Sequence, residues 1–329
     1  MKHALFILSL FFCCALQAQK KQDLQKYYSN VWQAEQYLLE ENYKKAADHY
    51  KDAFKHKKWA FDRDYYNAKY SCEMAKVKDT FWKKKYGGMN EKAMKIIREI
   101  HSDDQRVRQN DTIYDKNLQT DTIALERIHR EMDIQDSLNI IRFKELMKSI
   151  NVFDESVVNY DEIGIFFNHW FLHDSTLQDY FLPIALEAVH AGTFNPLNYV
   201  NMASIRAWRM GGEGTISDYG MNYLTIYRKD TDEYCNDTCT FLAFSYNQGN
   251  SEWLERVNKN RAEIYLENVK KQTIRDFLLW ERNLREKGGI RATAQFICVM
   301  PQEVFQQFVE RVKANPNINY FLTGERSFD

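Results

Sequence analysis

The sequence predicts a mainly α-helical protein, in which helical hairpins precede a helical domain, a small β hairpin and a C-terminal α/β appendage. Aromatic residues make up 15% of the chain, whereas proline occurs only 4 times. That combination favours packed helices over long loops or disorder. Apolar residues recur at helical spacing along most of the chain, and they alternate as in strands only in its last third. The 329 residues provide enough material for two or three domains.

The first 18 residues have the three parts of a secretory signal peptide. A short positive start at Lys2 precedes an apolar run over residues 4–16, and Ala18 offers a small residue before a cleavage site at Gln19. The run is too short to span a bilayer, and no later stretch approaches the required length. We therefore expect an exported protein, periplasmic or extracellular, without a membrane span.

A lipid-anchored form would keep Cys13 or Cys14 as its first residue. Bulky Phe11 and Phe12 stand where small residues usually precede such a cysteine, so the sequence favours the unanchored form.

Export would place the later cysteines in an oxidising compartment. Cys235 and Cys239 close the short loop CNDTC, either as a local disulfide or as half of a metal site. No second CxxC and no nearby His pair completes such a metal site. Cys72 falls in a helical pattern and is expected to be a small buried residue.

Charge is unevenly distributed although the net charge is −1. Residues 20–100 hold 19 Lys/Arg against 12 Asp/Glu, whereas residues 101–200 hold 8 against 17. The two blocks attract each other within one molecule, or present a basic surface to an anionic partner, or are simply solvated helix faces. The chain is not basic enough to indicate nucleic-acid binding.

Residues 22–98 have the spacing of paired helices. The residues at the key positions are Ala34, Tyr37, Tyr43, Ala46, Tyr50, Ala53 and Phe54. A weaker copy begins near Phe61, with Ala68 in the place of Ala34, and ends at Gly87 and Gly88. This segment resembles one complete and one degraded tetratricopeptide repeat. Such repeats imply a groove for a protein or peptide partner, lined by Tyr, Lys and Asn side chains of the inner helices. The alternative is a helical cap that covers the apolar face of the next domain.

The middle of the chain contains several local helix signals. A long helical pattern covers residues 118–150, with a break near Asp136, and a second covers residues 161–171. Asp174 begins the next helix and Gly192 ends it. Asn195 and Pro196 then begin a helix that stops before Gly211 and Gly212.

The last third mixes strands and helices. Strand-like alternation covers residues 221–228, 240–245, 291–300 and 318–323. Helices are expected over residues 253–286, with a bend near Glu267, and over residues 301–313. The expected organisation is a signal peptide (1–18), repeats (19–98), a helical domain (99–270) and a C-terminal helix with an appendage (271–329).

About half of the chain, residues 100–270, resembles an exported bacterial family known only as a domain of unknown function. Its pattern is an Asp-Gln…Arg start, an Asp-x-x-Asn, a His helix, a Leu-Pro helix, an Asp-Arg pair and a closing Tyr-Gly-Thr-Gln. The matching residues here are Asp104, Gln105, Arg108, Asp136, Asn139, His169, Asp174, Gln178, Leu182, Pro183, Leu186, Ala188, Arg206, Tyr219 and Gly220. Ile205 replaces the Asp of the pair, Ser217 stands where Gln is common, and Met221 and Asn222 replace the Thr-Gln. The resemblance supplies no activity.

Four polar residues form a candidate pocket: His169, Asp174, Arg206 and Tyr219. In such a pocket His169 would act as a general base, and Arg206 would bind a carboxylate or phosphate. The same residues equally suit a structural network, because buried polar groups need partners.

A metal site is a weaker interpretation. His169 and His173 lie four residues apart and share a helix face, but the third ligand is missing unless His190, Glu187 or Asp218 comes close. The alternative is a buried His169 that bonds a carbonyl or Asp174, with His173 capping the helix end. We expect no cofactor.

Two functional hypotheses follow. The first is a secreted binding or scaffold protein that holds a protein or peptide partner through the repeat block. The second is a hydrolase-like enzyme that uses His169, with Arg206 holding an anionic substrate. The altered Asp-Arg pair favours binding. The sequence gives neither the ligand nor the oligomeric state.

Overall fold

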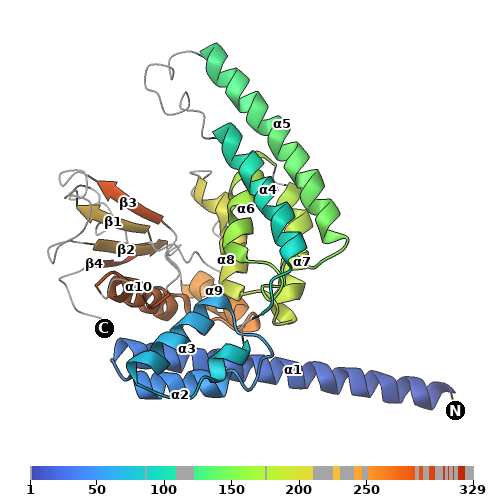
Figure 1. The fold of residues 1–329 in the computed structure, drawn as a ribbon, viewed down its shortest axis with the longest axis vertical. Helices are drawn as coiled ribbons and strands as arrows, with labels where there is room; N and C mark the ends of the chain where they lie inside the picture. The colour runs from blue at the N-terminus through green and yellow to red at the C-terminus, as the bar shows by residue number, and fades with distance from the viewer. Residues whose placement is uncertain are drawn as a thin grey trace. The chain divides into compact units, whose positions relative to one another are not determined.

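The computed structural model is mainly helical, as the sequence predicts (Figure 1). It describes the backbone of residues 2–85, 87–108, 122–174, 176–209, 225–229, 241–246, 251–285, 289–291, 296–300 and 318–322, with the single residues 307, 310 and 314. Side chains are described for most of these residues, but not for residues 2–17, 205–209 or the four strands. Within the described ranges no helix has the length and apolar character that a bilayer span requires.

The chain divides into two units. Unit 1 comprises residues 1–86 and 216–329, and unit 2 comprises residues 87–215. This division differs from the four consecutive segments expected from the sequence, because unit 1 combines both ends of the chain. The expected boundary at residue 98 falls inside one helix, α4 (Glu91–Arg108).

Unit 1 begins with two helices in close contact, α1 (Lys2–Leu39) and α2 (Tyr43–Ala53). Ala34 and Ala46 are fully buried, and their small side chains let the two helix backbones approach closely. Asn42 begins α2, since its side-chain oxygen accepts a hydrogen bond from the Lys45 amide at 3.3 Å. Sequence spacing and local capping therefore agree for this hairpin.

The next helix, α3 (Asp62–Met74), has only a short 3₁₀ helix after it, η1 (Phe81–Lys85). A complete second repeat would need an α-helix in that position. The Asp79 carboxylate instead accepts from the Phe81 amide at 3.0 Å and fixes a tight turn there. Cys72 of α3 is a buried free thiol, which confirms the expectation for this residue.

The last part of unit 1 contains α9 (Ser251–Glu263) and α10 (Val269–Arg285). The sequence pattern predicts one bent helix over residues 253–286, and this is wrong because a turn interrupts it. Tyr265 has a φ of 64°, which no α-helix residue adopts. The turn redirects the chain, so α10 packs against α1.

Four strands form one sheet in the order β3-β1-β2-β4. They are β1 (Thr225–Lys229), β2 (Phe241–Tyr246), β3 (Phe296–Met300) and β4 (Ile318–Leu322). β1 is antiparallel to β2 and parallel to β3, and β2 is antiparallel to β4. The expected separate appendage is therefore replaced by two edge strands on β1 and β2. The helix expected over 301–313 and the Cys235–Cys239 loop lie outside the described residues.

Unit 2 consists of five α-helices in its described part. They are α4, α5 (Thr122–Met147), α6 (Tyr160–His173), α7 (Thr176–His190) and α8 (Pro196–Arg209). α5 runs without interruption through Asp136, so the expected break there is wrong. Asp136 is buried and paired, and an acidic residue in that state does not interrupt a helix.

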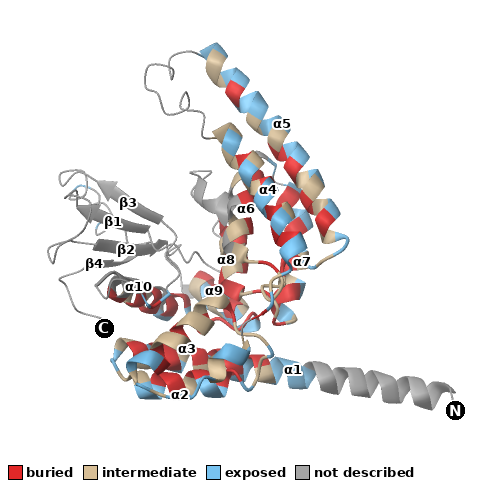
Figure 2. Ribbon diagram, viewed as in Figure 1, coloured by how far each residue is buried: buried red, intermediate tan, exposed pale blue. Residues whose placement is uncertain are grey.

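Aromatic rings fill the core of unit 2. The Phe143 ring of α5 lies 5.3–6.0 Å from the rings of four residues of α6 and α7: Phe166, Phe167, Trp170 and Phe181. All five side chains are completely buried, and Figure 2 shows buried positions in red along these helices. This packing fixes α5 and α6, which carry Asp136 and His169 of the candidate site.

Candidate functional site

The structure separates Asp174 from the expected pocket. The Asp174 carboxylate accepts hydrogen bonds from the Thr176 amide at 2.9 Å and the Thr176 hydroxyl at 2.7 Å, so it caps α7. These bonds lower the pKa of the exposed Asp174. The helix start that predicts α7 thus explains this aspartate, and it is not the acidic partner of His169. The side chain of Arg206 and the whole of Tyr219 lie outside the described residues.

His169 contacts Asp104, an aspartate 65 residues earlier in the chain. The His169 Nδ1 lies 3.1 Å from both carboxylate oxygens of Asp104. Asp104 is on α4 with 0% of its side chain exposed, whereas His169 on α6 keeps 18%. A carboxylate only accepts, so this contact places a proton on Nδ1, and in the neutral form of the ring Nε2 is the nitrogen with the lone pair.

Arg108 joins the same aspartate to a second one. Its Nη1 donates to Asp104 at 2.7 Å, and its Nη2 donates to both oxygens of Asp136 at 2.7 and 2.8 Å. We call Asp104, Arg108, Asp136 and His169 the Asp104 cluster. Burial raises the pKa of Asp136, and the hydrogen bonds from Arg108 oppose that rise. The Arg108 guanidinium already donates hydrogen bonds to two carboxylates, so it is poorly placed to bind a substrate anion.

One amide side chain extends the Asp104 cluster, and two others connect α5 to α4 beside it. Gln105 donates to Asp104 at 2.8 Å, and Gln135 donates to the Asn139 side-chain oxygen at 3.0 Å. Asn139 in turn donates to the Ile100 carbonyl at 3.5 Å. The network therefore ties α4, α5 and α6 together. Asp104, Gln105, Arg108, Asp136, Asn139 and His169 all belong to the pattern on which the sequence resemblance rests, but the sequence led us to propose only His169 among them as a site residue.

The spacing of Asp104 and Arg108 in the sequence is a signal of their pairing that we did not use. Asp104 and Arg108 lie four residues apart and so share one face of α4. His169 was identified, but its acidic partner was sought in the adjacent sequence. No local pattern predicts a contact between helices 65 residues apart.

The Asp104 cluster has the parts of an acid–base site. A buried carboxylate that holds Nδ1 orients the ring and leaves Nε2 available as a base or ligand. Within the described residues, no three His, Cys, Asp or Glu side chains are arranged to hold a metal ion. The side chain of His173, the second histidine of the weak metal hypothesis, is outside that part of the chain.

A second charged network lies on the face where the repeat resemblance implies a peptide groove. Arg63 of α3 donates to Glu35 of α1 at 2.5 Å and to Asp276 of α10 at 2.7 Å. Arg275 of α10 lies 2.8 Å from the other Glu35 oxygen. We call Glu35, Arg63, Arg275 and Asp276 the Glu35 network. Burial raises the pKa of Asp276, and Arg63 opposes that rise.

Other contacts attach the same C-terminal segment to α1 and α3. Asn67 and the Arg291 backbone exchange two hydrogen bonds, at 2.7 and 2.9 Å. Tyr28 stacks on Tyr265 with ring centroids 5.6 Å apart. Tyr265, Asp276 and the Arg291 backbone therefore contact side chains of α1 and α3.

Comparisons with protein-family models, curated proteins and solved structures gave no match. We therefore argue function from the residues of this chain alone.

Proposed function

We propose that this protein is an exported helical scaffold that binds another protein, and that the binding surface lies on α5. One observation carries the proposal. Among the described residues, four of the six large hydrophobic side chains that are exposed lie on this one helix: Ile123 (79% exposed), Ile134 (56%), Leu138 (52%) and Ile141 (65%). We call these four residues the α5 stripe.

The α5 stripe is ordered along the helix. Ile134, Leu138 and Ile141 lie four and three residues apart, and Ile123 lies three turns before Ile134, so all four share one face. Single exposed apolar residues are common and need no explanation. A row of four β-branched or γ-branched aliphatic residues on the solvent side of one helix instead favours a binding surface.

The binding surface expected from the repeats is a weaker candidate. The Glu35 network and the Tyr28–Tyr265 stack place the chain's own α10 segment where a partner peptide would lie. We propose that the tetratricopeptide-like block holds this segment in place. The buried small residues Ala34, Ala46, Ala53 and Ala68, which occupy the repeat positions, support a repeat-like pairing of helices.

Export is part of the proposal and rests on the pattern of residues 2–18. The buried core of α1 begins at Leu24, and residues 18–22 are exposed. Cleavage after Ala18 would therefore remove no buried residue of the described part of α1.

The proposal can be tested with a photo-crosslinking residue. Introduced in place of Ile141 in the producing bacterium, it should form a protein adduct, and the same residue in place of Lys92 on α4 should not. Ile134→Ser together with Leu138→Ser should abolish the adduct without changing the helical circular dichroism, because both positions are exposed. If no adduct depends on the α5 stripe, the scaffold proposal fails.

A hydrolase-like enzyme is the second candidate, and the contact between His169 and buried Asp104 favours it. In that case Nε2 of His169 would take a proton from water, and Arg206 would hold the anionic substrate.

Replacing His169 separates the two candidates. Since His169 is part-exposed, His169→Ala should fold with a loss of about 1 kcal/mol in the free energy of unfolding. A scaffold has no turnover to lose. The enzyme would be established if the native protein hydrolysed p-nitrophenyl phosphate or acetate and the folded His169→Ala variant did not. A stoichiometric metal ion that is present in the native protein and lost in the variant would establish it as well. Lys92→Glu is the matched surface control.

A further inference from the structure

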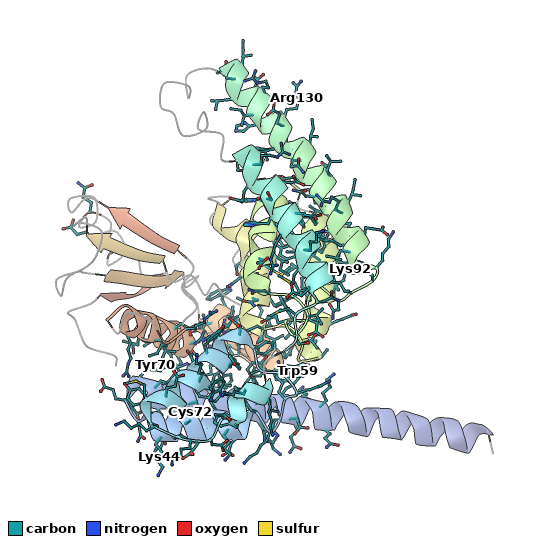
Figure 3. The ribbon with its side chains drawn as sticks, viewed as in Figure 1. Lys44, Trp59, Tyr70, Cys72, Lys92 and Arg130 are labelled. Atoms are coloured by element: carbon teal, nitrogen blue, oxygen red, sulfur yellow. The ribbon has the colours of Figure 1, made fainter. Side chains whose placement is uncertain are left out.

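The α5 stripe continues into charged residues on the same helix face. Arg127 and Arg130 lie at helical spacing between Ile123 and Ile134, and Glu145 follows Ile141. The opposite face of α5 is already used, since its buried residues Ile128, Asn139, Phe143 and Leu146 face the core of unit 2. Figure 3 shows the Arg130 side chain extending from α5. From Arg127 to Glu145, the exposed face thus carries two basic residues, then three aliphatic residues and then one acidic residue.

The spacing of these residues is nearly the same when the helix is turned end for end, whereas the charges at the two ends are opposite. From Arg130 through Ile134, Leu138 and Ile141 to Glu145, the intervals are four, four, three and four residues. We infer that α5 pairs antiparallel with α5 of a second copy of this chain, which names the partner in the scaffold function proposed above. Leu138 then lies near the two-fold axis, and Ile134 of one copy meets Ile141 of the other. A twofold contact of this kind needs such a self-complementary surface.

The charges of Arg130 and Glu145 favour an antiparallel over a parallel orientation of the two α5 helices. In the antiparallel pair Arg130 of each copy lies opposite Glu145 of the other, which gives two opposite-charge contacts. A parallel pair would place Arg130 beside Arg130 and Glu145 beside Glu145, and like charges in such positions disfavour pairing. Among the described residues of one copy, Glu145 pairs with Lys148 at 2.5 Å, and both side chains are exposed, so a guanidinium can reach the Glu145 carboxylate.

The charges also favour a second copy over a lipid surface. Glu145 and the two arginines are on the same face as the aliphatic residues, and a membrane would have to desolvate the carboxylate. An antiparallel helix neutralises it instead. Arg127 lies opposite Lys148 in this register, at the solvent-exposed ends of the pair, where salt screens like charges.

The expected affinity is modest. A helix of 26 residues is about 39 Å long, and in this register only Ile134, Leu138 and Ile141 of the α5 stripe meet the second helix. A contact of this size is at the small end of specific interfaces, so we expect a dissociation constant of roughly 1–100 μM.

Sedimentation of the full chain without its leader tests the pairing. The native protein should pass from monomer to dimer across that concentration range. Leu138→Glu should make it monomeric at every concentration, because two carboxylates would meet at the axis. Arg130→Glu and Glu145→Arg should each weaken the dimer at least tenfold, and the two together should restore it. Lys92→Glu, exposed on another helix of unit 2, should leave the dimer unchanged.

Each other outcome overturns the inference. A native protein that stays monomeric at several hundred micromolar does not pair through α5. A dimer that survives Leu138→Glu forms through another surface. Failure of the double charge exchange to restore the dimer excludes the antiparallel register. The scaffold proposal is separable, because a stripe-dependent adduct with a different protein would support it while removing the second copy as the partner.

Discussion

Buried charges are the residues whose environment is hardest to read from the sequence. Asp104 and Asp174 both lie in or beside helices. Asp104 is completely buried against Arg108 and His169, whereas Asp174 is an exposed helix cap. The cap was predictable because its partner is two residues away. The buried pair was not, because its partners are positioned by the packing of three helices.

Asp64 of α3 is a buried acid whose environment makes stability depend on pH. The Tyr27 hydroxyl donates to it at 2.6 Å, and both side chains are buried. Burial raises the pKa of Asp64 from 3.8 to about 6, with a further contribution from Glu35. A group whose folded-state pKa is raised binds its proton more tightly in the folded protein, so its contribution favours folding at low pH.

We predict that Asp64→Asn stabilises the protein at neutral pH. As pH rises from about 4 to about 6, the unfolded chain releases the Asp64 proton and the folded chain retains it, which costs up to about 3 kcal/mol of stability. Asparagine keeps an acceptor for Tyr27 and cannot ionise. In urea unfolding, the variant and the native protein should therefore agree near pH 4 and diverge by pH 7. Asp52→Asn, at an exposed position, is the control; equal differences at both pH values would contradict the burial argument.

Helices with local start and stop signals were predicted well. Asn195 accepts from the Leu197 amide at 3.0 Å and Pro196 opens α8, while Gly192, with a φ of 72°, ends α7. These features depend on neighbours in the sequence, and the sequence contains them directly.

Elements set by distant contacts were predicted poorly. The turn at Tyr265 divides α9 from α10, and α10 is held against α1 and α3 by the Glu35 network. Gly289 shows how close this packing is, since its φ is 115° and a Cβ there would lie 2.6 Å from the Tyr70 ring. Hydrophobic periodicity indicates which face of a helix is buried but not which helix covers it, so the contact of α10 with α1 and α3 could not be predicted.

At the scale of the whole molecule, unit 1 depends on both ends of the chain and unit 2 on one continuous segment. The aromatic core around Phe143 and the Asp104 cluster are formed entirely by residues 87–215. In unit 1, Glu35 and Arg63 come from the N-terminal part, whereas Arg275 and Asp276 come from the C-terminal part. The two units should therefore respond differently to truncation.

We predict that residues 87–215 fold alone, whereas residues 19–86 need the C-terminal part. A fragment of residues 19–215 leaves the buried Glu35 and Arg63 without Arg275 and Asp276, and loss of one partner of a buried ion pair costs about 3–5 kcal/mol. It also exposes Tyr28, which loses its stack with Tyr265.

In limited trypsin digestion, this fragment should be cut within residues 19–86 and yield a resistant core close to 87–215. That core should unfold cooperatively on heating, as the isolated 87–215 fragment should. The full chain from residue 19 is the control, in which both segments should resist trypsin. Equal protection of residues 19–86 in the fragment and the full chain would show that the helical hairpins are stable without α10.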